Sequence, residues 1–286
     1  MKNTRLLSLG LLLSAGSFLT ACSNDDGASD DSPARSTWTL KVKAMKGGNE
    51  ATTRALSLGG TNNKTLYATW AKGENVYVYY ESDQTTHGVL QPDKDNDNWT
   101  TLSGNLTGFA DNFITNNAGG FDITLLFPRE KPITWEGQNG TLTNIAQNFD
   151  WATATVKVIA AKSANNENEI LEATSAIFEN LQAIVKFTLL QSNGSALPSN
   201  PTALTVSGGA YSVTLPNITS ETYTKNGGNG VLYVAIPCFK NKAHLNLTLN
   251  ATLDEGTYTY TKSNVAFENG KYYDITVKMT KSSANP

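Results

Sequence analysis

The chain has 286 residues, a formal net charge of −3 at pH 7, and only 16% charged residues. This near-neutral balance argues against nucleic acid or an anionic lipid surface as an electrostatic partner. Cys22 and Cys238 are the only cysteines, which excludes a disulfide framework, so the stability of the chain must come from a hydrophobic core.

The N-terminus has the order of a secretory signal. Lys2 and Arg5 precede an apolar run that ends at Leu19 and is shorter than the roughly 20 residues of a membrane-spanning helix. The run closes in Leu19-Thr20-Ala21-Cys22, which resembles the lipobox of bacterial lipoproteins. The resemblance implies that residues 1–21 are a cleaved signal peptide and that Cys22 carries the lipid that holds the protein on a membrane. An ordinary cleaved signal with an incidental cysteine is the alternative.

Residues 22–36 are polar and acidic and show no apolar periodicity, which predicts a flexible tether. The loss of Lys2 and Arg5 with the signal would lower the net charge from −3 to −5. The pair Asp25-Asp26 is similar to the acidic signal that sends lipoproteins of Bacteroidetes to the outer face of the outer membrane. The resemblance implies a surface-exposed outer-membrane lipoprotein.

The rest of the chain is patterned for strands joined by turns. Residues 37–43 alternate, with Trp38, Leu40 and Val42 on one face, which predicts a half-buried strand. Only residues 144–149 indicate a helical turn. Further strands are predicted in a first series (65–71, 75–80, 100–106, 121–127 and 153–160) and in a second series that begins at residue 176 (183–190, 202–206, 210–215, 231–236, 244–249, 258–262 and 272–279).

This spacing is typical of an all-β chain, and we expect two mostly antiparallel β-sandwiches. The polar run 163–169 separates the two series. We therefore place a domain boundary near residue 173, with an N-terminal domain over residues 37–172 and a C-terminal domain over residues 173–286.

Several segments occur in an order that carries a family resemblance: 53–56 (TRAL), 68–79 (ATWAKGENVYVY), 126–128 (LFP), 137–142 (GQNGTL), 149–154 (FDWATA), 178–187 (FENLQAIVKF) and 270–277 (GKYYDITV). Together with the lipobox they resemble the fimbrillin family of Bacteroidales, which comprises pilins and fimbria-associated lipoproteins. The resemblance covers most of the mature chain. It implies two transthyretin-like β-sandwich domains.

The resemblance also implies assembly by strand exchange. An Arg-specific surface protease would cut between Arg54 and Ala55, and the first strand, with Trp38, Leu40 and Val42, would be released. A strand from another pilin subunit would then fill the groove by β-augmentation. The expected function is a fimbrial (pilus) subunit or a fimbria-associated adhesin, with a host or bacterial surface as the adhesion ligand.

The C-terminus departs from the pattern of stalk pilins, which carry a C-terminal extension as the donor. After the last predicted strand, residues 280–286 contain no large apolar side chain. Either Tyr273, Ile275, Val277 and Met279 themselves form the donor strand, or this subunit accepts a strand and donates none. The second option suggests a tip or accessory subunit, and both remain open.

No metal site is expected. Asp93, Asp95 and Asp97 have the spacing that opens an EF-hand loop, but the glycine and the glutamate that the loop needs at later positions are missing. His87 and His244 are the only histidines and fall in different predicted domains, which argues against a zinc cluster.

No catalytic motif is present either. Cys238 is interpreted as a small buried hydrophobe without a neighbouring base. Glu167, Glu169 and Glu172 fit an acidic linker better than the carboxylate pair of a glycosidase. We expect no cofactor and no enzymatic activity.

The aromatic residues support an alternative function, a monomeric surface-anchored lipoprotein that binds glycans. Trp99 and Trp135 lie beside turn residues and are the candidates for an exposed patch that stacks on sugar rings. Trp151 is expected in the core. Tyr258 and Tyr260 fit either role.

Overall fold

The computed structural model describes residues 38–47, 57–59, 65–67, 69–94, 98–109, 111–117, 119–161, 170–209, 211–219, 222–223, 230–238 and 242–282, and the regular elements among them are almost all strands. Cys22, Arg54 and Ala55 lie outside these ranges. No helix among the described residues is long and apolar enough to cross a membrane. The expectation of an all-β chain is confirmed, with two large sheets and a small third one, β2 (Ser57–Gly59) with β3 (Thr65–Tyr67).

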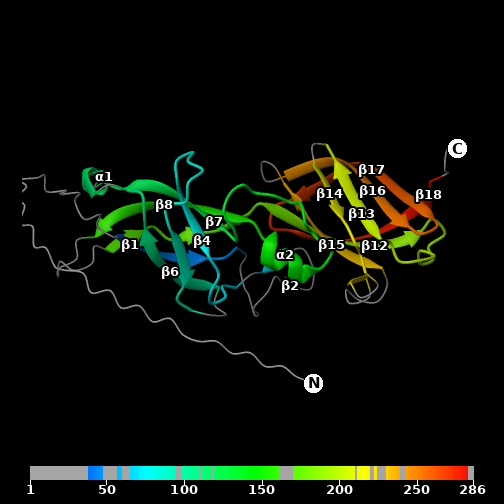
Figure 1. Cartoon of the computed structure of the whole chain (residues 1–286), viewed down its shortest axis with the longest axis horizontal. Coiled ribbons are helices and arrows are strands. Elements are labelled where there is room, and N and C mark those ends of the chain that lie inside the picture. Colours follow the sequence, from blue (N-terminus) through cyan, green and yellow to red (C-terminus); the bar gives the residue numbers. More distant parts are fainter. Residues whose placement is uncertain are drawn as a thin grey trace, which may run out of the picture. The chain divides into compact units, whose positions relative to one another are not determined.

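The first large sheet, of which Figure 1 labels β1, β4, β6, β7 and β8, closes on itself through its strand pairing. Strand β9 pairs with both β1 and β8, and this double pairing completes a ring that runs β1-β6-β5-β4-β7-β8-β9. A closed ring has no free edge, so its backbone groups are paired all the way round. The strands are β1 (Trp38–Met45), β4 (Val76–Tyr80), β5 (Val89–Pro92), β6 (Trp99–Leu106), β7 (Phe121–Phe127), β8 (Ala152–Ala161) and β9 (Ile170–Ala173), with β10 (Ala176–Ile177) and β11 (Glu179–Asn180) beside them.

The stretch at the predicted domain boundary is strand rather than linker. Ile170 to Ala173 form β9, in which Leu171 is fully buried and Glu172 is exposed. The pairing of β1 with β9 and with β10 is parallel, in a sheet that we expected to be mostly antiparallel. Sheet membership changes only between β11 and β12 (Gln182–Gln191), later than residue 173.

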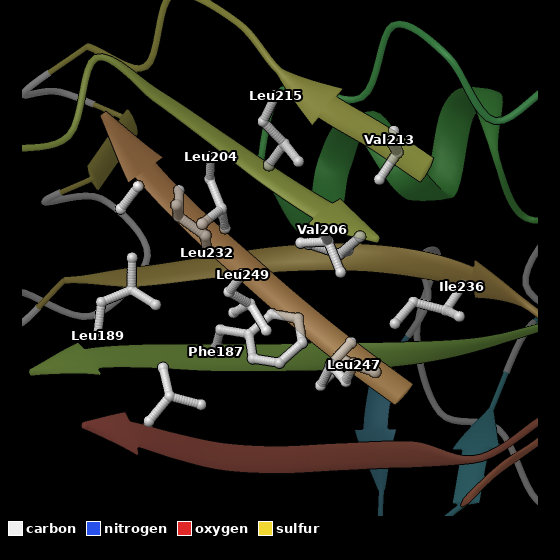
Figure 2. Close-up of a cluster of buried hydrophobic side chains, with 14 of the residues drawn as sticks. Phe187, Leu189, Leu204, Val206, Val213, Leu215, Leu232, Ile236, Leu247 and Leu249 are labelled. Atoms are coloured by element: carbon white, nitrogen blue, oxygen red, sulfur yellow. The ribbon is translucent and has the colours of Figure 1, made fainter. Parts of the chain in front are cut away.

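The second large sheet is open and has seven strands. Its order is β14 (Tyr211–Leu215), β13 (Ala203–Gly208), β16 (Lys242–Leu253), β17 (Gly256–Glu268), β18 (Tyr272–Lys281), β12 and β15 (Val231–Pro237). Strands β16 and β17 form a long hairpin whose tight turn ends at Gly256, where a φ of +126° favours glycine. Figure 2 shows the core of this sheet, in which Phe187 of β12, Leu249 of β16 and Val206 of β13 belong to one buried cluster.

Most predicted strands are found, and the predicted helical turn is helix α2 (Leu142–Asn148). Thr141 caps this helix, because its hydroxyl oxygen accepts a hydrogen bond from the Asn144 N–H at 3.1 Å. Strand β5 and helix α1 (Asp111–Asn116) were not anticipated. Phe113 of α1 packs edge-on against Tyr80 of β4, a tertiary contact that has no periodic signal in the sequence.

The segment before α2 completes the outer edge of β15. The Gln138 amide donates to the Ala235 carbonyl at 3.0 Å and accepts from the Ala235 N–H at 2.7 Å, so this side chain pairs with β15 as a neighbouring strand would. The Gly140 carbonyl accepts from the Tyr233 N–H at 2.9 Å. Gly140 must be small, because a Cβ there would lie 2.7 Å from Leu232 Cδ2. This segment protects an edge that would otherwise be free for pairing.

We predict that Gln138→Ala lowers the free energy of unfolding by about 1–3 kcal/mol, because it leaves the buried N–H of Ala235 without its partner and removes one of two donors to the Ala235 carbonyl, which also accepts from the Tyr211 hydroxyl at 2.9 Å. Denaturant titration would measure the loss. Gln84→Ala is the matched control, since Gln84 is exposed and bonds only locally to the Ser82 carbonyl. Equal effects of the two changes would contradict the role assigned to Gln138.

Candidate functional site

Strand β1 is held along both of its edges. On one side it pairs antiparallel with β6 over its whole length, from Trp38 opposite Leu106 to Met45 opposite Trp99. On the other side it pairs in parallel with β9 and then with β10. The predicted first strand is therefore an interior member of the ring, and its departure would unpair two flanking edges at once.

The inward face of β1 is an apolar row. Trp38, Leu40 and Val42 are buried, as predicted, and the row continues with the fully buried Ala44. Lys41 and Lys43 on the opposite face are exposed. The side chains decrease in size along the row, from Trp38 to Ala44.

Because side chains alternate between the two faces of a strand, the inward row continues into a charged residue, Lys46. Lys46 follows Ala44 on the inward face and is only 5% exposed. Its ammonium lies 2.6 Å from Glu74 Oε1, and it donates to the Thr69 carbonyl at 3.5 Å. It also lies 3.9 Å from the centre of the Phe127 ring, within the range of a cation–π contact.

A second carboxyl group lines the same cavity as Lys46 and feels its charge. Asp150 is 3% exposed, and its Oδ1 accepts a hydrogen bond from the Gln182 amide at 3.1 Å. Burial raises the pKa of Asp150 to about 6, and the negative charge of Glu74 adds to this rise. The positive charge of Lys46 and the hydrogen bond from Gln182 oppose the rise. The cluster of Lys46, Glu74 and Asp150, called the cation site below, holds one cation against two carboxyl groups.

A cavity of about 510 Å³ lies against the cation site. Lys46, Glu74 and Asp150 line it, together with Pro128 after β7 and Leu142 of helix α2. Because these charges border a cavity rather than close packing, the site has room for a different side chain that carries the same charge.

The sequence prediction ended the buried row at Val42 and missed the cation site. The signal that could have indicated it is the position of Lys46, which lies two residues after Ala44 and therefore on the same inward face of the strand. Glu74 and Asp150 lie inside segments 68–79 and 149–154, which carry the family resemblance, but nothing in the sequence alone places them beside Lys46.

The predicted donor residues lie in β18, in the interior of the second sheet. This strand pairs in parallel with β12 and antiparallel with β17. Val277 and Met279 are fully buried in the core of that sheet, while Tyr273 and Ile275 are partly buried against it. The structure does not bring these residues near β1 through any strand pairing.

The two candidate surface tryptophans differ. Trp99 is 38% exposed, with the Lys43 ammonium 5.3 Å from the centre of its ring. Trp135 is only partly exposed and packs against three buried clusters, which does not fit a surface patch. Trp151 is fully buried as expected, and its indole N–H donates to the Thr134 carbonyl at 3.1 Å. Tyr258 is buried and Tyr260 partly exposed.

The other candidates serve local structure. His87 contacts Asp83 at 3.0 Å, Asp93 accepts from the Ser103 hydroxyl at 2.7 Å, and Cys238 is buried with its thiol 3.5 Å from the Ile236 carbonyl. Within the described part of the chain, no group of three or more His, Cys, Asp or Glu residues is arranged to hold a metal ion. Asp95, Asp97, Glu167 and Glu169 lie outside the described residues, and the side chain of His244 is not described.

The raised pKa of Asp150 predicts a pH-dependent stability. The folded chain holds this proton more tightly than the unfolded chain, whose carboxyl has a pKa near 3.8. The stabilisation is therefore complete below pH 3.8 and is lost as the pH rises toward about 6. Relative to Asp150→Asn, we expect the wild type to lose free energy of unfolding, of the order of 2 kcal/mol, between pH 4 and pH 7.

Chemical denaturation at several pH values would measure this difference, and Asp122→Asn, at an exposed position of β7, is the control that should follow the wild type. Parallel curves for the wild type and Asp150→Asn would show that Asp150 does not titrate in this range.

Comparison with known proteins finds similar solved structures but neither a matching family model nor a matching curated protein. A fimbrial protein from Bacteroides ovatus is 12% identical with a TM-score of 0.39, over 86% of this chain and 50% of that one. This chain therefore spans about half of the length of that protein. A candidate cell adhesion protein from Bacteroides ovatus is 12% identical with a TM-score of 0.42, over 87% and 97% of the two chains. The C-terminally truncated tip fimbrial protein Mfa3 from Porphyromonas gingivalis is 9% identical with a TM-score of 0.37, over 85% and 95%.

Proposed function

We propose that the chain is a fimbrial subunit or fimbria-associated adhesin that is exported as a lipoprotein and joins a neighbouring subunit by exchange of strand β1. One observation carries the proposal: β1 is the first described strand, it buries an apolar row, and it pairs along both edges. Arg54 lies nine residues after the end of β1 in the chain. A single cut there would separate the strand from the rest of the fold.

Release of β1 would create a specific acceptor. The edges of β6 and β9 would lose their backbone partners, and the places of Trp38, Leu40 and Val42 would open to water. Each large apolar side chain that returns to such a place contributes roughly 1.5–3 kcal/mol. A strand from another subunit would recover the backbone pairs as well.

The position of β18 supports the role of an acceptor that donates no strand. Withdrawal of β18 would break its pairs with β12 and β17 and would remove Val277 and Met279 from the core of the second sheet. We therefore propose a tip or accessory subunit. The two large sheets would correspond to the two transthyretin-like domains that the sequence resemblance implies.

The lipid on Cys22 would then serve delivery rather than permanent anchoring. A cut after Arg54 removes everything from Cys22 through β1. The lipid would hold the precursor at the outer face of the outer membrane until another subunit supplies its strand. Its partners would be other pilin subunits and an Arg-specific surface protease.

We predict that Arg54→Ala abolishes processing and assembly. The precursor would keep its lipid and stay monomeric, because β1 would remain in the ring. Expression with the cognate protease, followed by immunoblotting for size and mild-detergent gels for ladders, would measure both effects. Arg54→Lys should behave in the same way toward an Arg-specific protease, whereas Arg35→Ala should leave processing unchanged. Normal shortening of Arg54→Ala would disprove the cut site.

A disulfide between β17 and β18 tests the role of β18 as a donor. Thr259 and Thr280 are direct partners across the two antiparallel strands, a separation that a disulfide spans. We predict that Thr259→Cys/Thr280→Cys assembles equally well oxidised and reduced, because β18 stays in place. Loss of ladders only in the oxidised form would identify β18 as the donor.

The second candidate, a monomeric lipoprotein that binds glycans, is favoured by one feature. Trp99 is exposed opposite Met45 in the register, and Ile177, the next residue along this row, is 57% exposed. Such a row could stack on a sugar ring. A chain that keeps acylated Cys22 and is retarded by polysaccharide in affinity electrophoresis would favour this function.

A further inference from the structure

The strand that is proposed to leave carries its own buried charge. Lys46 precedes Arg54, so a cut after Arg54 removes the ammonium together with β1. Glu74 and Asp150 belong to the part of the chain that stays. Lys46 is the only cation within 4.0 Å of Glu74 among the ion pairs of the described residues.

The departure of Lys46 would leave the cation site unbalanced. Glu74 would lose its ion-pair partner, and Asp150, which is 3% exposed, would lose the positive charge that favours its ionised form. A buried charge that has lost its partner destabilises a fold strongly, more than the intact pair stabilises it. An incoming strand that offered only apolar side chains would fill the groove but leave this charge uncompensated.

We propose that the strand accepted in place of β1 must carry a lysine or arginine on its inward face, two residues after a small side chain, and that this cation pairs with Glu74 beside Asp150. This inference rests on the strand exchange proposed above. The partner is thus a strand of another polypeptide with large apolar residues at alternate positions, then a small residue, then a basic one, in the order of Trp38, Leu40, Val42, Ala44 and Lys46.

The charge would also set the register. A shift by one residue would turn the inward row outward, and a shift by two would bring the cation against the apolar neighbours of Ala44. Backbone pairing alone does not distinguish such shifts. The cavity beside the cation site leaves room for the larger guanidinium of arginine as well as for an ammonium.

Strand β18 has the same spacing, with Tyr273, Ile275, Val277 and Met279 followed by Lys281. In the fold it carries the required charge but is paired with both β12 and β17. A synthetic peptide of residues 273–281 tests whether the sequence of β18 can enter the groove when the strand is not held by β12 and β17. Its Met279 is larger than Ala44, so we expect it to bind more weakly than a peptide with the sequence of residues 38–46.

The test uses the full chain, cut after Arg54 by an arginine-specific protease in the presence of an excess of a fluorescent peptide with the sequence of residues 38–46. Bound peptide is measured by anisotropy after gel filtration. Competing peptides replace the position of Lys46 by Arg, Met or Glu. We expect Arg to compete nearly as well as Lys, Met to be at least about tenfold weaker, and Glu to be the weakest.

A peptide with Met at the position of Lys41 is the matched control, because it loses the same charge on the exposed face of the strand. It should bind as the unchanged peptide does. The uncut Arg54→Ala chain should take up none of the peptides, since β1 still fills the groove. In the cut Glu74→Gln/Asp150→Asn chain, the preference for Lys over Met should largely disappear.

The outcomes separate the two proposals. Equal binding of the Lys and Met peptides would overturn the inference and leave strand exchange intact. Failure of every peptide, including the unchanged one, to enter the cut chain would overturn strand exchange and the inference with it. A double variant that keeps the full preference would show that the carboxyl groups are not its source. If that variant does not fold, the peptide series on the unchanged chain decides alone.

Discussion

The structure depends on the position of one strand, β1, between β6 on one side and β9 with β10 on the other. A ring of strands has no edge only while every member is present. The buried row from Trp38 to Ala44 ties that pairing to the apolar core, so backbone and side chains depend on the same eight-residue strand. The first sheet is therefore complete only with a strand in this place.

The cation site adds a constraint that apolar packing cannot supply. Hydrophobic contacts depend on area and are not directional, so they tolerate alternative strands of similar size. A buried ammonium that pairs with Glu74 and acts on the charge of Asp150 requires one charge at one position. Such groups add little net stability, and where they are retained, specificity of register is the best-attested reason.

The second sheet is open, and one of its edges is protected in a different way. Its edge strand β15 is covered by a side chain and a carbonyl group of the segment before α2 rather than by a further strand. Gln138 satisfies both backbone groups of Ala235, which explains how a polar side chain with no exposed surface is tolerated. The first sheet thus removes its edges by closing, and the second protects the edge at β15.

Local patterns in the sequence were sufficient for the strands whose side chains alternate or form a short apolar run. Residues 121–127 are predicted and found as β7 with the same bounds, and the buried face of Trp38, Leu40 and Val42 follows from alternation alone, because the strand period of two places these side chains on one face. Strand β9 was not predicted because it is short and follows the polar run 163–169. It forms a strand because it pairs with β1, a distant segment that its local composition does not indicate.

The sequence by itself determined the all-β class, the strand content and the polarity of each face, since these depend on neighbouring residues. Only the tertiary structure decided that the first sheet closes, that β18 is an interior strand, and that Glu74 and Asp150 meet Lys46. These features join residues that are far apart in the chain, and their energies come from backbone pairing and from charges brought together on folding. No local pattern encodes which distant partner will be there.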